Sequence, residues 1–306
     1  MEALEQIKET IQGFLRDLKS PLVLEISKDL QSGKMLRSKL ILSIAGINQD
    51  SILLCAIIEM IQNASLLHDD VIDNANMRRC KPSINAMQGN KNAIMLGDLF
   101  YSKAFCVLTT LAKKYPEIPS IVSESVVQLS LGEMEDVHLS KAFNDDKKKY
   151  LAMVEKKTAS LIEASALGAA LLAKKNNQNA QKFKIYGKNL GIAFQIIDDI
   201  LDITADNDQL GKPALSDFKE GKTTLPYIYL YSYLQEADKE CLKSLFKKEL
   251  SSKESAWILE KIQESEAIAK SFQDAKNFAQ SGIAAIKDQK CDKLVAIMQE
   301  MINRKF

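Results

Sequence analysis

The helical spacing of apolar residues is the feature of this sequence that most restricts its fold. Near the N-terminus, apolar side chains recur at the three- and four-residue intervals of an amphipathic helix, at Leu4, Ile7, Ile11, Phe14 and Leu18. Similar patterns continue to the C-terminus, and no run of β-branched residues alternates with polar ones as in a strand. With 12 Gly and 6 Pro in 306 residues, about half the usual share of helix breakers, the chain is predicted to be all-α.

The chain offers no clear boundary between domains. Gly and Pro residues are densest between positions 205 and 226, but neither this segment nor any other has the composition of a flexible linker. The hydrophobic share of 46% and the charged share of 26% are typical of globular proteins and exclude a disordered or low-complexity chain. We therefore expect a single large helical domain over residues 1–306.

Charge and cysteine content exclude several functional classes. Lys and Arg number 41 against 40 Asp and Glu, with no basic block, so a nucleic-acid partner is not expected. The five cysteines include no C-x-x-C pair, which argues against a disulfide framework or a zinc site. The longest apolar stretches, 52–61 and 161–173, contain Glu59 and Glu163 and are too short to span a bilayer. Since the N-terminus also lacks a signal-peptide pattern, we expect a cytoplasmic protein without a transmembrane segment.

Two aspartate clusters carry the chemical signal. Residues 69–73 and 198–202 each read D-D-x-x-D within an apolar segment. On a helix, the first and last aspartates of each cluster project from one face, so Asp69 and Asp73 form one pair and Asp198 and Asp202 another. Their neighbours are apolar residues rather than compensating Lys or Arg, so a divalent cation is expected to supply the positive charge. Oxygen ligands without His or Cys favour Mg²⁺.

Basic residues lie near both clusters in the sequence. Each one alone would be read as an ordinary surface cation, but together they suit a diphosphate, which Arg and Lys can hold beside bound Mg²⁺. The set consists of Lys34, Arg37, Arg78, Arg79, Lys157, Lys212 and Lys222.

The ordered motifs resemble those of the trans-type polyprenyl diphosphate synthases over almost the whole chain. The second aspartate cluster stands within G-x-x-F-Q-x-x-D-D-x-x-D, which begins at Gly191. The other matching blocks are Gly33-Lys34-x-Leu36-Arg37, Arg78-Arg79, Gly97-Asp98, Lys157-Thr158, Gly211-Lys212-Pro213 and Gly221-Lys222-Thr223-Thr224-Leu225-Pro226.

The resemblance implies a homodimeric all-α bundle around a central cavity, with about three Mg²⁺ ions at each active site. It implies a metal-binding set of Asp69, Asp70, Asp73, Asp198 and Asp202. The allylic diphosphate would be bound by Arg78, Lys157, Thr158, Gln195, Lys212 and Lys222, and isopentenyl diphosphate by Lys34, Arg37, Gln62 and Arg79. Metal and guanidinium charge would stabilise the departing diphosphate, while the segments at Lys157-Thr158 and Phe194-Gln195 would shield an allylic cation.

Four positions depart from the family pattern or need separate interpretation. Gln62 stands where bacterial members usually have His, and the nearby His68 is interpreted as structural. Met35 interrupts the first basic block, and Cys80 stands where Gly usually follows the arginine pair. The last two put the shape of their loops in doubt.

Product length is predicted from the residues one helical turn before Asp69. Ala64 and Ser65 are small, whereas relatives with short products commonly have an aromatic residue at this level. We therefore expect a long-chain synthase that makes membrane-bound octaprenyl diphosphate for quinone side chains, with farnesyl diphosphate as the allylic substrate. A geranylgeranyl or farnesyl diphosphate synthase is the alternative, and a non-catalytic partner subunit is a further one.

Overall fold

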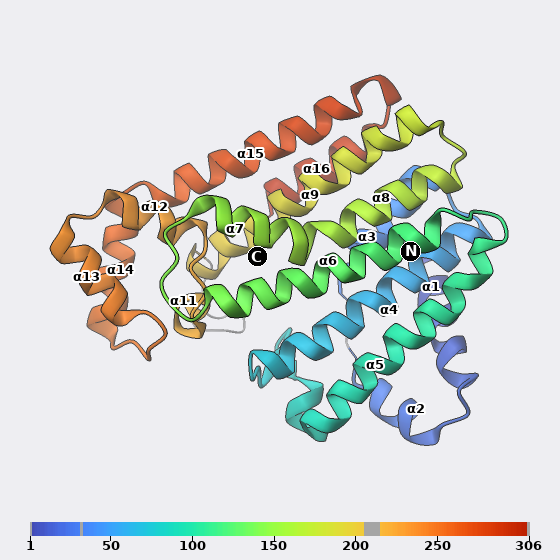
Figure 1. Ribbon diagram of the computed structural model, residues 1–306, viewed down its shortest axis with the longest axis horizontal. Helices are drawn as coiled ribbons and strands as arrows, with labels where there is room; N and C mark the ends of the chain where they lie inside the picture. Colours follow the sequence, from blue (N-terminus) through green and yellow to red (C-terminus); the bar gives the residue numbers. More distant parts are fainter. Residues whose placement is uncertain (1, 31–32, 205–214, 305–306) are drawn as a thin grey trace. The chain divides into compact units, whose positions relative to one another are not determined.

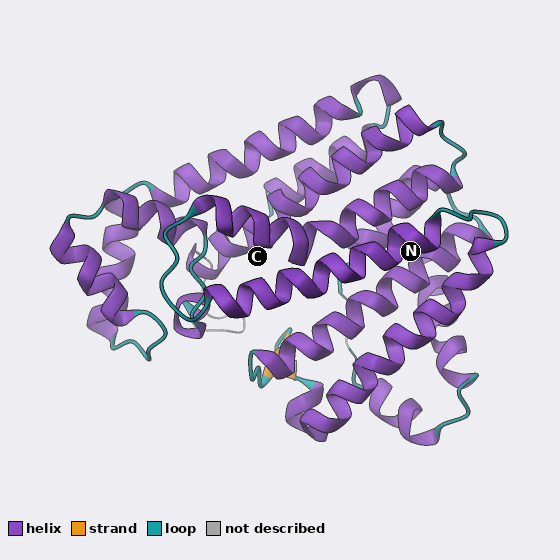
Figure 2. Cartoon of the chain, viewed as in Figure 1, coloured by secondary structure: helices purple, strands orange, loops and turns teal. Residues whose placement is uncertain are grey.

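The computed structural model describes residues 2–30, 33–204 and 215–304, and these residues are mostly helical (Figures 1 and 2). The all-α prediction is confirmed. Within these ranges the only strands are β1 (Met77–Arg78) and β2 (Lys81–Pro82), which pair as a short antiparallel hairpin.

The chain divides into two compact units. Unit 1 comprises Met1–Val126 and Ala164–Lys184, and unit 2 comprises Val127–Glu163 and Ile185–Phe306. Asp69 and its neighbours belong to unit 1 and Asp198 and its neighbours to unit 2, so each cluster is described within its own unit. The single domain over 1–306 and its central cavity stay predictions.

Unit 1 is organised around one long helix, α4 (Gln49–Ile72), which packs against α1, α3 and α5. It begins at a capping box in which Asn48 and Ser51 each accept the other's backbone N–H. Its apolar side chains, including Leu54, Ile57 and Ile61, are fully buried. The other helices of unit 1 are α1 (Glu2–Arg16), α2 (Pro21–Ser27), α3 (Leu36–Ala45) and α5 (Ile84–Ala112).

Three helices contribute residues to both units: α6 (Ile118–Leu139), α8 (Ser160–Leu172) and α9 (Asn177–Thr204). The remaining elements of unit 2 are α7 (Lys147–Val154), η1 (Glu155–Ala159), α11 (Ser216–Glu220), α12 (Leu225–Tyr233), α13 (Glu236–Leu245), α14 (Ser252–Glu264), α15 (Ala267–Ala285), η2 (Lys287–Gln289) and α16 (Asp292–Ile302).

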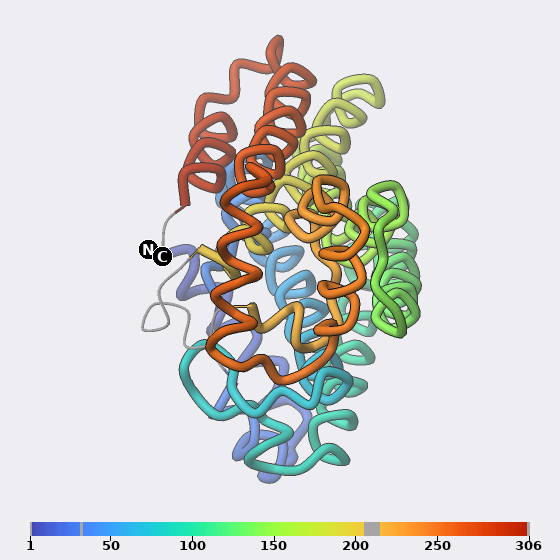
Figure 3. The backbone as a smooth tube through the Cα atoms, turned by 90° about the vertical axis from the view of Figure 1, so that its left-hand side faces the viewer, coloured from blue at the N-terminus to red at the C-terminus, as the bar shows by residue number. Residues whose placement is uncertain are grey.

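The helices of unit 2 share an aromatic-rich core. Helix α12 packs against α7, α14 and α15, and the chain then turns so that α16 runs back beside α15 (Figures 1 and 3). Phe218 and Tyr227 are fully buried in this core, with ring centroids 4.8 Å apart. Such aromatic contacts add to the hydrophobic stabilisation of the unit.

Two helices are long and apolar enough to span a bilayer, judged by length and composition alone. They are α4 and α5, and 61% of the most apolar window of α4 and 39% of that of α5 are buried inside the protein. Core helices of soluble proteins satisfy the same criterion, so these two helices are weak evidence for a membrane span.

Candidate active site

The first aspartate cluster lies at the C-terminal end of α4. Asp69 and Asp70 are in the last turns of the helix, and Asp73 is its C-cap residue. The C-terminus carries the negative end of the helix dipole, so these carboxylates add to a potential that is already negative. This end of α4 therefore attracts cations.

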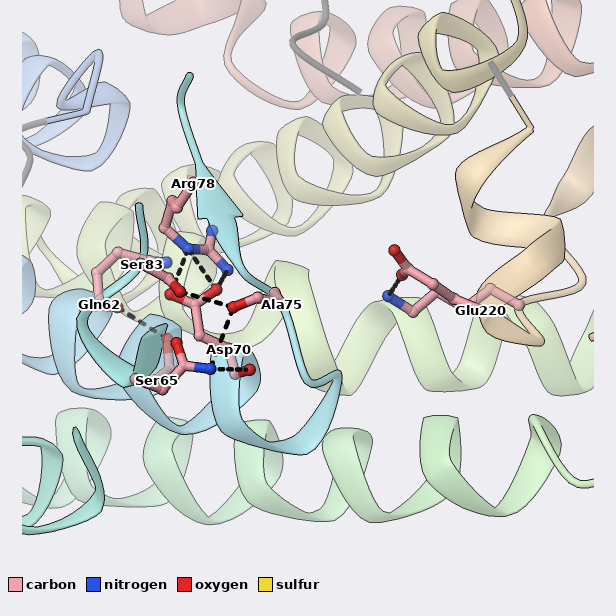
Figure 4. Close-up of polar contacts among 9 residues, drawn as sticks. Gln62, Ser65, Asp70, Ala75, Arg78, Ser83 and Glu220 are labelled. Atoms are coloured by element: carbon pink, nitrogen blue, oxygen red, sulfur yellow. Dashed lines mark hydrogen bonds and ion pairs between the residues drawn. The ribbon is translucent and has the colours of Figure 1, made fainter. Parts of the chain in front are cut away.

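Arg78 on β1 is one such cation. Its Nε donates to both carboxylate oxygens of Asp70, at 2.7 and 2.9 Å, and its Nη2 lies 2.6 Å from Oδ1 (Figure 4). The Asp70 residue is only 4% exposed, and the guanidinium compensates for its lost hydration. In this arrangement Asp70 holds Arg78 beside the cluster, and its role as a metal ligand stays a prediction.

Hydrogen bonds to the backbone fix the segment between α4 and the hairpin. The side-chain amide of Asn85 donates to the carbonyls of Asp70 and Ala75, at 3.2 and 3.1 Å. The Ser83 hydroxyl donates to the Ala75 carbonyl at 2.6 Å (Figure 4). The start of α5 thereby restrains the position of Arg78.

Two of the arginines predicted to bind isopentenyl diphosphate lie near one carboxylate. Burial lowers the pKa of Arg37 to about 10, against the opposing effect of Glu59. Burial also lowers the pKa of Arg79, and Glu59 again opposes the shift. The Ser38 hydroxyl donates to Glu59 at 2.6 Å and so helps to hold this carboxylate in place. Within the described ranges, the buried Nε of Arg37 has no hydrogen-bond partner, which fits a site for an anionic ligand.

The segment around Gly33 approaches the same arginines. A Cβ on Gly33 would lie 2.5 Å from Nη2 of Arg79, so only a glycine permits this contact without movement. Lys34 is exposed next to it. Gln62 is half-buried on α4, on the face that Asp69 shares because seven residues make about two helical turns. The structure thus brings Gly33 and Arg79 together, while ligand binding by Lys34 and Gln62 stays a prediction.

Ala64 and Ser65 are buried on α4. Ala64 is fully buried and Ser65 is 4% exposed, and the Ser65 hydroxyl donates to the carbonyl of Gln62 on its own helix (Figure 4). Neither side chain adds bulk at this level of the helix.

His68 is held between α4 and α5. Its Nε2 lies 3.2 Å from the Ile94 carbonyl and 3.3 Å from the Asp98 carboxylate. A Cβ on Gly97 would lie 2.4 Å from the same nitrogen, so the ring packs directly on the α5 backbone. These contacts support the structural interpretation of His68.

The second aspartate cluster occupies the corresponding position on α9, near its C-terminal end. Asp202 is buried and accepts hydrogen bonds from the Ser216 hydroxyl and, at 3.2 Å, from the Asp217 backbone N–H. Its carboxylate thereby anchors the start of α11, and its role as a metal ligand stays a prediction.

Asp198 pairs with an arginine at the end of the chain. The Nη2 of Arg304 contacts Oδ1 of Asp198, and its guanidinium carbon lies 5.1 Å from the centre of the Phe194 ring. Asp198 and Phe194 are one helical turn apart on α9, so the arginine covers one face of the second cluster.

Lys157 and Thr158 lie in η1, a single π-helical turn between α7 and α8. Two glycines contact this turn: a Cβ on Gly132 of α6 would lie 2.2 Å from the Lys157 backbone nitrogen, and one on Gly191 of α9 would lie 2.5 Å from Cα of Ala159. Single π-turns of this kind are frequent at functional sites.

Acidic residues surround the lysines predicted to bind the allylic diphosphate. Nζ of Lys157 lies 2.8 Å from Glu133 and 2.5 Å from Asp136, both on α6. Nζ of Lys222 lies 2.8 Å from Glu220. Lys212 lies outside the described residues. Diphosphate binding by these lysines stays a prediction.

A chain of hydrogen bonds links the second aspartate cluster to η1. Tyr150 donates to Oδ2 of Asp199 at 2.5 Å, Gln195 donates to Oδ1 at 2.8 Å, and Thr158 donates to the Gln195 side-chain oxygen at 2.8 Å. Burial raises the pKa of Asp199 to about 7, and the hydrogen bonds from Tyr150 and Gln195 oppose this shift. Burial and the adjacent Asp199 raise the pKa of Tyr150 well above its ordinary value, so its hydroxyl remains a donor.

The donor set fits a hard divalent cation. Within the described part of the chain, no three His, Cys, Asp or Glu residues are grouped closely enough to enclose a metal ion. Mg²⁺ is commonly held by one or two carboxylates, with waters and substrate phosphates completing its coordination. Asp69, Asp73 and Asp198, which are only partly buried, suit that mode of binding.

The sequence analysis missed the residues that position the predicted ones. Tyr150 and Arg304 contact the second cluster, and Glu59 lies near two arginines of unit 1. Only Tyr150 had a usable signal, because it precedes Lys157 by two helical turns. The other two residues belong to segments whose helical patterns showed nothing unusual.

The chain belongs to the polyprenyl synthetase family, whose model matches residues 20–262. The fold and the aspartate-bearing helix ends agree with that assignment. The family uses divalent metal ions and its members are prenyltransferases, so this chain is a transferase of prenyl groups.

Solved structures and curated relatives support the same assignment. The crystal structure of octaprenyl pyrophosphate synthase from Helicobacter pylori is 43% identical, covers 99% of both chains and superposes with a TM-score of 0.92. A geranylgeranyl diphosphate synthase from Sulfolobus acidocaldarius is 37% identical over 76% of this chain and 69% of its own length. A polyprenyl synthase from Caulobacter crescentus, solved with calcium and isoprenyl diphosphate, is 26% identical over 99% of this chain and 96% of its own, with a TM-score of 0.87.

Proposed function

We propose that this protein condenses isopentenyl diphosphate with farnesyl diphosphate and repeats the reaction to make all-trans octaprenyl diphosphate for quinone side chains. The reaction requires about three Mg²⁺ ions at each active site. The small side chains of Ala64 and Ser65, both buried one turn before Asp69, carry the proposal for product length. The H. pylori relative named as an octaprenyl synthase supports it.

In the proposed reaction, the carbon–oxygen bond to the allylic diphosphate breaks and its electrons leave with the diphosphate. Mg²⁺ held by Asp69, Asp73 and Asp198 would neutralise the leaving group. Arg78, fixed by Asp70, and Lys157 in η1 add positive charge at the diphosphate oxygens.

The second substrate supplies the new carbon–carbon bond. Lys34, Arg37, Gln62 and Arg79 hold isopentenyl diphosphate so that its double bond attacks the allylic cation. The proton lost from the resulting cation passes to the released diphosphate. Oxygen atoms at Thr158 and Gln195 face the cation rather than water.

Product analysis tests this proposal. Purified protein is incubated with Mg²⁺, farnesyl diphosphate and labelled isopentenyl diphosphate, and the dephosphorylated products are separated by length. Octaprenol as the main product is the expected result. Products that stop at farnesyl or geranylgeranyl length would retain the enzyme class and favour the alternative that the S. acidocaldarius relative supports. No incorporation would favour the non-catalytic subunit.

Ser65→Phe tests the length argument on the same chain. An aromatic ring in place of this small, buried side chain should block the growing tail, so products should shorten by several isoprene units while the first condensation continues. Ser65→Thr is the matched control and should leave product length unchanged. Octaprenol from Ser65→Phe would contradict a path past Ser65.

We also propose that the protein is a cytoplasmic homodimer whose product enters the membrane. In α6, Val127, Leu131 and Met134 follow one helix face and are 51%, 43% and 69% exposed. A contiguous apolar stripe on a helix typically marks a contact surface. A second copy of the chain is the proposed partner for this stripe.

A further inference from the structure

Tyr150 is the first member of the hydrogen-bond chain that ends at Thr158. Its side chain is 1% exposed, and its hydroxyl meets the Asp199 carboxylate inside unit 2. It contacts none of the residues predicted to bind substrate, so its effect on them is indirect.

The direction of each hydrogen bond follows from the chemistry of the groups. Because both Tyr150 and Gln195 donate to Asp199, the Gln195 amide must turn its NH₂ group toward this carboxylate. Its oxygen then faces Thr158 and accepts the Thr158 proton. Thr158 has no second proton, so it presents oxygen lone pairs on its remaining side.

This orientation suits one partner better than another. Lone pairs attract a developing allylic cation and repel diphosphate oxygens. The Thr158 hydroxyl therefore acts on the cation in this arrangement, provided that the Gln195 amide keeps its orientation.

We propose that Tyr150 is a positioning residue that, through Asp199, fixes the orientation of the Gln195 amide and so keeps the oxygen of Thr158 directed at the reacting allylic carbon. This inference rests on the proposed placement of the allylic substrate at Thr158 and Gln195. Tyr150→Phe removes one oxygen and retains the buried ring. Asp199 then loses a donor, and the Gln195 amide can rotate.

Steady-state kinetics with farnesyl and isopentenyl diphosphates test the inference. Tyr150→Phe should lower kcat by about 10-fold to 100-fold, as substitutions of groups that orient functional residues do. The KM for isopentenyl diphosphate and the Mg²⁺ concentration for half-maximal activity should change less than about twofold. Farnesyl thiolodiphosphate, an unreactive analogue of the allylic substrate, should bind as it does to the unaltered enzyme, because the effect concerns the transition state.

Tyr186→Phe is the matched control. Tyr186 is also fully buried in unit 2, and its hydroxyl donates to the Leu294 carbonyl at 2.7 Å, so its loss also removes one buried hydrogen bond. It should lower thermal stability as much as Tyr150→Phe does and leave kcat nearly unchanged. Equal losses of kcat in the two variants would assign Tyr150 a purely structural role and overturn the inference.

A double-mutant cycle identifies the route of the effect. If Tyr150 acts through Thr158, then Tyr150→Phe in a Thr158→Val background should lower kcat no further. Additive losses would show that Tyr150 acts elsewhere, for example on metal binding at Asp198, and would overturn the inference. The unaltered enzyme's product analysis stands apart from this cycle, so failure of the proposed function would be recognised separately.

Discussion

Two residues at the tip of the hairpin adopt a backbone conformation that their side chains disfavour. Arg79 and Cys80 have φ values of +52° and +63°, as in the two-residue turns that favour Gly at the second position. Met35, the other departure from the family pattern, is also left-handed, with φ of +51°. The doubt about loop shape that the sequence raised therefore concerns backbone strain at both positions.

Cys80→Gly should stabilise the protein. A non-glycine residue in the left-handed region costs about 1–2 kcal/mol, and the greater freedom of glycine in the unfolded chain offsets part of the gain. We expect the free energy of unfolding to rise by about 0.5–1 kcal/mol, measured by urea denaturation.

The same substitution at Cys106 provides a control of opposite sign. Cys106 is exposed inside α5, where glycine should lower the free energy of unfolding by about 1 kcal/mol. A loss of stability in Cys80→Gly would mean that the left-handed conformation at the hairpin is not strained.

At the level of single residues, the sequence indicated the charged side chains but not what positions them. Asp69 and Arg78 were predicted because like charges in an apolar segment require partners. Tyr150 and Arg304 reach Asp199 and Asp198 across 49 and 106 residues of sequence. Such contacts depend on tertiary packing, for which local spacing gives no signal.

Among the elements, regular helices were predictable and the irregular turns were not. Apolar periodicity indicated α1 and α4, since burial of one face is what stabilises a helix in a protein. The π-turn η1 reads locally as part of a continuous helix, because Lys156 and Lys157 are good helix formers. Its geometry coincides with close approaches of two neighbouring helices, which a local pattern does not show.

Gly132→Ala should disturb η1. The new Cβ would lie 2.2 Å from the Lys157 nitrogen, so α6 or the π-turn would have to move. We expect the free energy of unfolding to fall by about 1–3 kcal/mol, as in overpacked cores, and turnover to fall by about 100-fold because a displacement near 1 Å misplaces Lys157 and Thr158. Urea denaturation and product formation measure the two effects.

Gly13→Ala is the control for that substitution. A Cβ there meets only the Arg16 guanidinium at 3.9 Å, so alanine inside α1 should raise stability by about 0.5–1 kcal/mol and leave turnover unchanged. Normal turnover in Gly132→Ala would contradict a positioning role for the contact between α6 and η1.

At the scale of the whole molecule, the end of the chain bears on metal binding. The scarcity of breakers indicated the fold class, but nothing local placed the C-terminus. Arg304 follows α16 and pairs with Asp198, a predicted metal ligand on α9, and its side chain is only 15% exposed. A divalent cation at Asp198 must compete with this guanidinium, because both interact with the same carboxylate.

Arg304→Gln should therefore strengthen metal binding. An ion pair of this partly exposed kind contributes up to about 1 kcal/mol, so we expect the dissociation constant for the divalent cation to fall by up to about fivefold. Electron paramagnetic resonance of free Mn²⁺ during a titration measures this without turnover. Lys293→Gln, an exposed position on the same α16, is the matched control and should leave metal affinity unchanged. Equal or weaker binding in Arg304→Gln would mean that the arginine supports the carboxylate geometry of the second cluster rather than competing with the metal.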